Sequence, residues 1–231
     1  MRNLPAIIDC LRDEFERVNA LRDETLRRSR QIIRLCANSI RAVHRDEFDV
    51  ARELLATARA AAAEMIADVG TQPDLYYAGY TQDALKELSE AHITLALVTD
   101  CDVPTPQELR VEAAAYLNGL AEAMGEVRRY VLDRLRRGDV AVGERLLQAM
   151  DEVYTLLITV DFPDAITGGL RRNTDMVRGV LERTRGDMTV AVRQEDMKAA
   201  LRSLTRNLGL PNLDETVEIN SAADGEDRVV A

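Results

Sequence analysis

Two pairs of glutamates have the spacing of a metal-binding site. Glu87 and Glu90 are three residues apart in DALKELSEAHI, and Glu122 and Glu126 are four apart in YLNGLAEAMGEVRR. On an α-helix, these spacings place both carboxylates of a pair on one face, one turn apart. Four such oxygen ligands on two facing helices suit Mg²⁺ or Mn²⁺, which can orient a phosphodiester and activate water. The pattern therefore indicates metal-dependent cleavage of a phosphodiester.

The same spacing also suits a solvated acidic face, because the chain contains forty Asp and Glu residues. The main apolar stripe of the segment that carries Glu122 and Glu126 falls on roughly the opposite side of the helix. The acidic side also holds Ala115, Asn118 and Gly119, which are small enough to let another helix or a ligand approach closely. Spacing alone leaves both interpretations open.

Other candidate residues indicate less chemistry. His92 is five residues after Glu87, so it does not share the face of the glutamates and is expected to be packed or exposed. His44 lies near the end of a long helix, where a basic residue is favoured by the helix dipole. The cysteines have neither disulfide nor zinc spacing: Cys10, Cys36 and Cys101.

Composition limits the class of protein. The chain has 231 residues, of which 46% are hydrophobic and 30% charged, and it has no Trp. These values are typical of a globular protein, and no run reaches the ~18 apolar residues that span a bilayer. The first residues do not read as a secretory signal. We expect a cytoplasmic protein without a membrane partner.

Charge is unevenly distributed along the chain. Residues 1–45 hold ten basic and six acidic groups, and residues 171–206 hold nine and five. Residues 46–170 hold ten basic and twenty-three acidic groups, and residues 207–231 hold one and six. Basic flanks around an acidic middle indicate two surfaces with different partners.

Helical periodicity dominates the sequence, and no segment alternates long enough to predict a strand. The pattern predicts an all-α fold in one helical domain, residues 1–208, followed by an acidic, disordered tail, residues 209–231. The first helix is unusually long. We expect seven helices: 6–43, 46–69, one from 73 or 81 to 99, 106–137, one ending at 160, one starting after 163 or 169, and one ending near 208.

Several segments together resemble the translin family. The segment SRQIIRLCANSIRAVHR has the family's Ser-Arg pair, spaced isoleucines and closing His-Arg. PDLYYAGYTQDALKELSEA and YLNGLAEAMGEVRR continue the likeness, and LRRNTDMVRGVLERTRGD extends it more weakly, so that it covers most of residues 12–190. The resemblance implies a seven-helix translin-like bundle with a long N-terminal helix, assembled into a hollow octamer.

The family has two types of subunit. Translin binds single-stranded DNA and RNA, whereas translin-associated factor X supplies a Mg²⁺-dependent endoribonuclease site. The nuclease's Glu-x-x-Glu-Ala segment matches Glu87 and Glu90, and its second acidic segment matches Glu122 and Glu126. The resemblance thus implies that these four residues are catalytic and bind Mg²⁺ or Mn²⁺. Glu122 stands where the nuclease has Asp, which lengthens this ligand by one methylene.

The basic site of translin is absent. Where translin has an Arg and two His residues after its paired tyrosines, this chain has Ala78, Tyr80 and Gln82. Nucleic acid must then bind elsewhere, and the basic first helix is the candidate. The nucleic-acid-binding residues that we predict are Arg22, Arg30, Arg34, Arg41 and Arg45.

The sequence as a whole predicts an archaeal-type, homo-oligomeric, metal-dependent endoribonuclease that acts on single-stranded or structured RNA. Its partners would be RNA, single-stranded DNA and further copies of the same chain. Two alternatives stay open: a single-stranded nucleic-acid binder without catalysis, whose acids are solvated, and a helical scaffold with no nucleic-acid role.

Overall fold

The computed structural model describes residues 3–209, and these residues form helices and connecting loops without a strand. The helices are α1 (Leu4–His44), α2 (Phe48–Val69), α3 (Pro73–Tyr76), α4 (Gly79–Val98), α5 (Pro106–Leu109), α6 (Ala113–Arg136), α7 (Val140–Leu157), α8 (Asp164–Thr167) and α9 (Leu170–Asn207). The chain is divided into two compact units, Met1–Thr184 and Arg185–Ala231. The all-α prediction is confirmed.

The division into helices differs from the predicted one at two places. The helix expected over 106–137 is interrupted at Arg110, whose backbone is left-handed (φ 56°), and this turn separates α5 from α6. The expected sixth and seventh helices are one continuous helix, α9, which passes through Gly179 and Gly186. The predicted tail, residues 209–231, lies outside the described residues except for Gly209, so its disorder stays a prediction.

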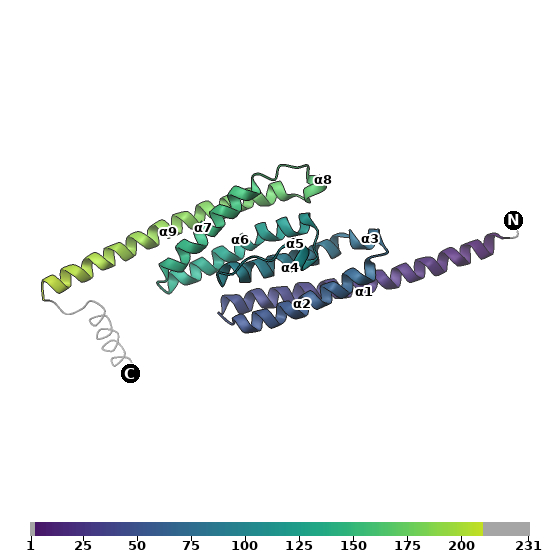
Figure 1. The fold of residues 1–231 in the computed structure, drawn as a ribbon, viewed down its shortest axis with the longest axis horizontal. Helices are drawn as coiled ribbons and strands as arrows, with labels where there is room; N and C mark the ends of the chain where they lie inside the picture. Colours follow the sequence, from purple (N-terminus) through teal and green to yellow (C-terminus); the bar gives the residue numbers. More distant parts are fainter. Residues whose placement is uncertain (1–2, 210–231) are drawn as a thin grey trace, which may run out of the picture. The chain divides into compact units, whose positions relative to one another are not determined.

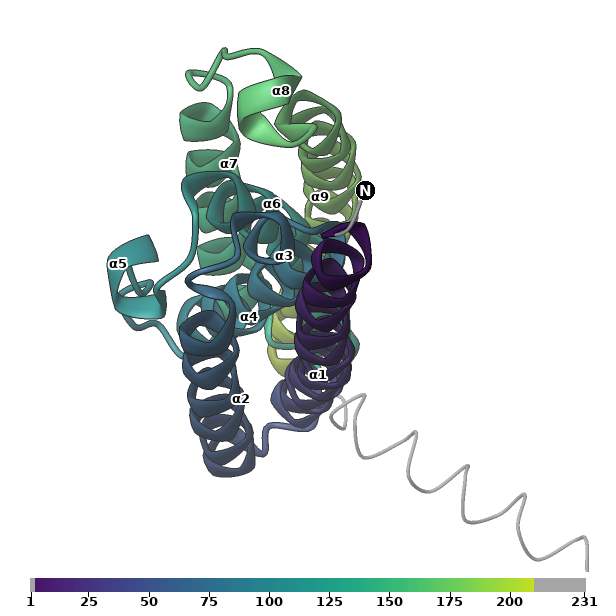
Figure 2. The same cartoon turned by 90° about the vertical axis from the view of Figure 1, so that its right-hand side faces the viewer.

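The first unit is built on a layered packing of its long helices. The helices α1 and α2 pack against each other and against α4, α6 packs on the other side of α4, and α7 packs on α6 (Figure 1). Figure 2 shows these helices nearly end-on, with α4 and α6 between the α1–α2 pair and α7. The core includes Ile32 of α1, Met65 of α2, Leu88 of α4 and Met124 of α6, all fully buried. In this arrangement α4 is covered by apolar contacts on several sides.

A glycine sets the distance between α4 and α6. A Cβ atom at Gly119 would lie 2.6 Å from the backbone oxygen of Lys86 and 2.8 Å from the Cβ of Ser89. Real side chains do not tolerate such distances, so only glycine allows the two helix backbones to approach this closely. The contact lies at the turn of α4 that carries Glu87 and Glu90.

Among the described residues, every helix is too short or too polar to cross a membrane.

Candidate metal centre

The close approach of α4 and α6 brings three carboxylates together. One oxygen each of Glu87, Glu90 and Glu122 can be chosen so that all three atoms lie within 4.8 Å of one another. All three side chains are partly buried. Oxygen atoms at this separation can bind a single divalent cation, and carboxylates are the ligands that Mg²⁺ and Mn²⁺ prefer.

These carboxylates line a cavity of about 450 Å³, which we call the acidic cavity. Its walls come from α1, α4, α6 and the first turns of α9, and all four predicted glutamates reach it. The lining residues are Ala37, Ile40, Arg41, Glu87, Glu90, Glu122, Glu126, Arg129 and Met176. The cavity therefore combines anionic ligands with two arginines.

Burial and mutual repulsion shift the carboxylates of α4. The pKa of Glu90 is raised to about 8. Burial is the main cause, and repulsion by the neighbouring Glu87 and Glu122 adds to it. Burial also raises the pKa of Glu87, while Lys86 opposes this shift. Neither Glu87 nor Glu90 has a hydrogen bond or an ion pair with any residue that the structure describes. Lys86 lowers the pKa of both carboxyls but forms no ion pair with either, so burial and mutual repulsion outweigh it.

Glu122 is in contact with an internal cation. The Nζ of Lys86 lies 2.7 Å from one carboxylate oxygen of Glu122 and donates a hydrogen bond of 2.9 Å to the other. Asn173 of α9 donates a longer hydrogen bond, 3.5 Å, to the same carboxylate and a bond of 2.9 Å to Asn118. These contacts fix the position of Glu122 at the edge of the cluster.

Glu126 is held by a histidine of another helix. Nε2 of His44, at the end of α1, lies 2.6 Å from the carboxylate of Glu126 and donates to it, since the ionised carboxylate can only accept. The hydrogen bond from His44 lowers the pKa of Glu126, although burial opposes the shift, and Arg129 lies 3.9 Å from the same oxygen. Glu126 lines the cavity but does not belong to the group of three oxygens within 4.8 Å.

The five arginines predicted to bind nucleic acid are all exposed, four of them on α1 and Arg45 at its C-terminal cap. At about 100° per residue, four of them lie within roughly 60° of one another around the helix, and Arg22 lies about 80° away from Arg30. Arg30 and Arg34 line one shallow cavity on this face, and Arg41 lines the acidic cavity. Arg22 and Arg45 pair with the neighbouring acids Asp23 and Glu47. We call Arg30, Arg34, Arg41 and Arg45 the α1 arginine row.

Solved structures of other proteins share this fold, and some are also similar to this chain in sequence. The crystal structure of AfC3PO matches with a TM-score of 0.76 and 32% identity, over 84% of this chain and 98% of that one. The chain belongs to the translin/C3PO family. A complex of AfC3PO with duplex RNA matches this family member with a TM-score of 0.72 at the same identity and coverage.

More distant relatives extend the comparison. The crystal structure of apo-NeC3PO has a TM-score of 0.73 over 80% of this C3PO-type chain and 96% of its own, and at 21% identity it shows the fold alone. An uncharacterized protein of Methanocaldococcus jannaschii, MJ0175, is 30% identical over 190 residues, which are 80% of this chain and 82% of the relative. No protein-family model matches the sequence.

Two residues at the centre of this C3PO-type chain were not predicted from sequence. Lys86 is one of only two lysines and lies one turn before Glu90, which was a usable signal for a cation at the site. His44 was assigned to a charge cluster at a helix end, but it is 8% exposed and bound to Glu126, 82 residues away. No spacing rule within one helix could have indicated that long-range contact.

Proposed function

We propose that this chain is a metal-dependent endoribonuclease of the translin/C3PO family that acts on single-stranded or structured RNA. The observation that carries the proposal is the group of three carboxylate oxygens, from Glu87, Glu90 and Glu122, within 4.8 Å of one another. Glu126, in the same cavity, is the fourth proposed ligand.

The donor set fits Mg²⁺ or Mn²⁺. The candidate ligands are carboxylate oxygens, and no thiol lines the cavity, which disfavours soft metals. Burial, with repulsion by Glu87, Glu122 and Glu126, raises the pKa of Glu90 to about 8, and a bound cation would favour the ionised form of this carboxyl. When bound, the ion would neutralise charge on the phosphate and lower the pKa of a water molecule for attack.

The chain's own groups would position the substrate. Arg41 of α1 and Arg129 of α6 line the acidic cavity, and both are exposed, so they can contact phosphate oxygens of RNA. Lys86 holds Glu122 in place through an ion pair, and His44 holds Glu126 through a hydrogen bond to its carboxylate. These two contacts would keep the carboxylates of Glu122 and Glu126 oriented before RNA binds.

A groove beside the acidic cavity would accept the neighbouring nucleotide. It has a volume of about 670 Å³ and shares Glu122 with the acidic cavity. Tyr77, 64% exposed, lies at this groove and offers a ring on which a base can stack. Asn118 and Asn173 add amide groups to the groove.

RNA as the substrate is supported by two observations. AfC3PO, 32% identical to this chain, forms a complex with duplex RNA. The α1 arginine row leads along one helix face to Arg41, which lines the acidic cavity. A row of arginines can follow a phosphate backbone without reading its sequence.

Assembly into a homo-oligomer, with an octamer as the expected form, is part of the proposal. The first turns of α1 expose apolar side chains that soluble monomers normally cover. These are Leu4, Ile7, Ile8, Leu11 and Phe15, with Phe15 exposed to 71%. A second copy of the chain is the occupant that the family suggests.

The decisive test is cleavage of labelled single-stranded and stem-loop RNA in Mg²⁺, in Mn²⁺ and in chelator. We expect cleavage only with metal, and a loss of about 100-fold or more in Glu87→Gln and Glu122→Gln, because each removes a ligand charge. Glu144→Gln is the matched control, since Glu144 is an exposed acid on α7 away from the cavity. Unchanged cleavage in both cavity variants would refute the site.

A binding protein without catalysis is the second candidate. It is favoured by the contacts of Lys86 with Glu122 and of His44 with Glu126, which already give two of the four carboxylates a partner without a metal. In that case RNA binding would weaken steeply with salt, as expected for arginine–phosphate contacts, and no cleavage would occur at any metal concentration.

A further inference from the structure

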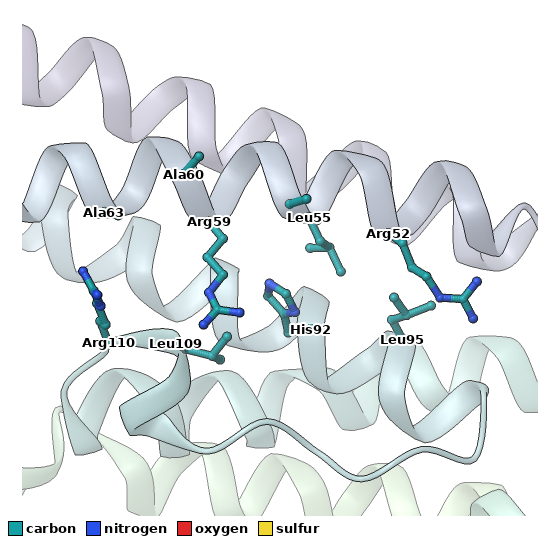
Figure 3. A pocket seen from close by; sticks show the side chains of 10 residues that line it. Arg52, Leu55, Arg59, Ala60, Ala63, His92, Leu95, Leu109 and Arg110 are labelled. Atoms are coloured by element: carbon teal, nitrogen blue, oxygen red, sulfur yellow. The ribbon is translucent and has the colours of Figure 1, made fainter.

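A second cavity, of about 550 Å³, lies between α2, α4 and the turn after α5. Figure 3 shows Arg59 of α2 and His92 of α4 at its centre, with Arg52 and Arg110 on either side. We call it the arginine pocket. It shares no lining residue with the acidic cavity, and His92 lies about 200° around α4 from Glu90.

The charge of the arginine pocket is unlike its surroundings. Residues 46–110 contain thirteen acidic residues and four Lys or Arg residues. Three of those four line this pocket, and no acidic residue lines it. A concentration of guanidinium groups in an acidic part of the chain forms a site for an anion.

Two of the three arginines, Arg59 and Arg110, have donors to spare, whereas Arg52 forms an ion pair with Asp49 at 2.7 Å. Arg59 gives one N–H to the backbone oxygen of Glu108 at 2.6 Å, and this is the one hydrogen bond it makes with a described residue. Arg110 has no side-chain hydrogen bond or ion pair with the part of the chain that the structure describes. Its backbone is left-handed, a conformation that usually favours glycine or asparagine, so an arginine stands there at a conformational cost.

His92 contributes a polar atom that the fold leaves unpaired. Its Nε2 is buried and has no hydrogen-bond partner among the described residues. A neutral imidazole has one donor and one acceptor nitrogen, and a ligand group can satisfy it.

The remaining wall is flat and apolar. Ala56, Ala60 and Ala63 are spaced so that their methyl groups form a strip along one side of α2. Leu55 and Leu95 are buried beneath the pocket, and the capping box between Thr105 and Glu108 holds α5. Such a strip can take a planar ring.

We propose that the arginine pocket binds a phosphomonoester that carries a planar ring, as in a mononucleotide or a 5′-phosphorylated RNA end. The phosphate would lie against Arg59 and Arg110, whose guanidinium groups match its several oxygens, and the ring would lie on the alanine strip near His92. This site is separate from the proposed nuclease centre.

The test is calorimetric titration of the full-length protein, in chelator, with AMP, adenosine, inorganic phosphate, and RNA oligonucleotides with or without a 5′-phosphate. We expect AMP to bind at least tenfold more tightly than adenosine or phosphate. Arg59→Ala and Arg110→Ala should each weaken AMP binding about tenfold or more, because each removes charged hydrogen bonds. Arg136→Ala, which removes an equal charge from an exposed position near the end of α6, should leave AMP binding unchanged.

The RNA arm identifies the source of the phosphate. If 5′-phosphorylated RNA competes with AMP and 5′-hydroxyl RNA does not, the pocket takes RNA ends; if neither competes, it takes free nucleotides. His92→Phe keeps an aromatic ring but removes both nitrogens, and weaker AMP binding in a variant with unchanged thermal stability supports the role of His92. Absence of AMP binding, or AMP binding unchanged in both Arg59→Ala and Arg110→Ala, would overturn the proposal.

Discussion

Glu90→Gln should stabilise the protein in the absence of metal, by an amount that grows with pH. The pKa of Glu90 is raised from 4.5 to about 8, so the folded state keeps a proton that the unfolded chain releases. Between these two values, the Glu90 carboxyl lowers the free energy of unfolding by about 1.36 kcal/mol for each pH unit. Glutamine keeps the shape of the side chain but has no proton to lose.

The magnitude follows from that slope. From pH 5 to pH 7, the stability difference between Glu90→Gln and the wild type should increase by roughly 2.5 kcal/mol in favour of the variant. For a chain of this length that corresponds to roughly 5–10 °C in melting temperature. The assay is urea denaturation in chelator at one fixed protein concentration, which keeps any effect of oligomerisation constant.

The control is again Glu144→Gln, whose stability difference from the wild type should stay constant with pH. At pH 8, added Mn²⁺ should make the wild type more stable than Glu90→Gln, because the ion binds the ionised wild-type cluster more tightly than it binds the variant. A stability difference between Glu90→Gln and the wild type that does not change from pH 5 to pH 7 would contradict the argument that Glu90 is buried among like charges.

Two further predictions concern the walls of the site. Gly119→Ala should cost about 1–3 kcal/mol of stability and weaken Mn²⁺ binding in calorimetry, since its Cβ would clash with the Lys86 backbone. Gly125→Ala is the control and should do neither, because no atom lies within 4 Å of its Cβ. Equal effects of the two variants would exclude close helix packing as the cause. Lys86→Met should tighten Mn²⁺ binding at least about threefold, because the 2.7 Å contact of Lys86 with Glu122 competes with the ion. Weaker Mn²⁺ binding in this variant would mean that Lys86 acts only to position Glu122.

The helical class and most helix positions could be predicted because apolar periodicity and Gly or Pro at helix ends are local signals. The break at Arg110 could not, since an arginine in a left-handed conformation gives no signal of the kind that glycine gives. The long helix α9 continues through Gly179 and Gly186 although glycine is unfavourable inside a helix, so its length could not be predicted from propensity.

For the site, spacing predicted which acids share a face but not whether those faces meet. The decisive quantity is the distance between α4 and α6, and it depends on Gly119 lying against the backbone of Lys86 and Glu90. The sequence showed a small residue beside the acids, but the helix on which it packs is a tertiary property. The contact of His44 with Glu126 across 82 residues was hidden for the same reason.

The four glutamates are not equivalent in the fold, and this difference bears on what the cluster can do. Glu122 forms an ion pair with Lys86, and Glu126 accepts a hydrogen bond from His44 and lies 3.9 Å from Arg129, so both carboxylates have partners within the chain. Glu87 and Glu90 have no such contact, yet the packing at Gly119 holds them against Glu122. Burial beside like charges costs stability and, without a metal, favours the protonated form of Glu90, whereas a divalent cation would favour the ionised carboxylates. The pair on α4, which has no direct basic partner among the described residues, is therefore where a bound ion would contribute most.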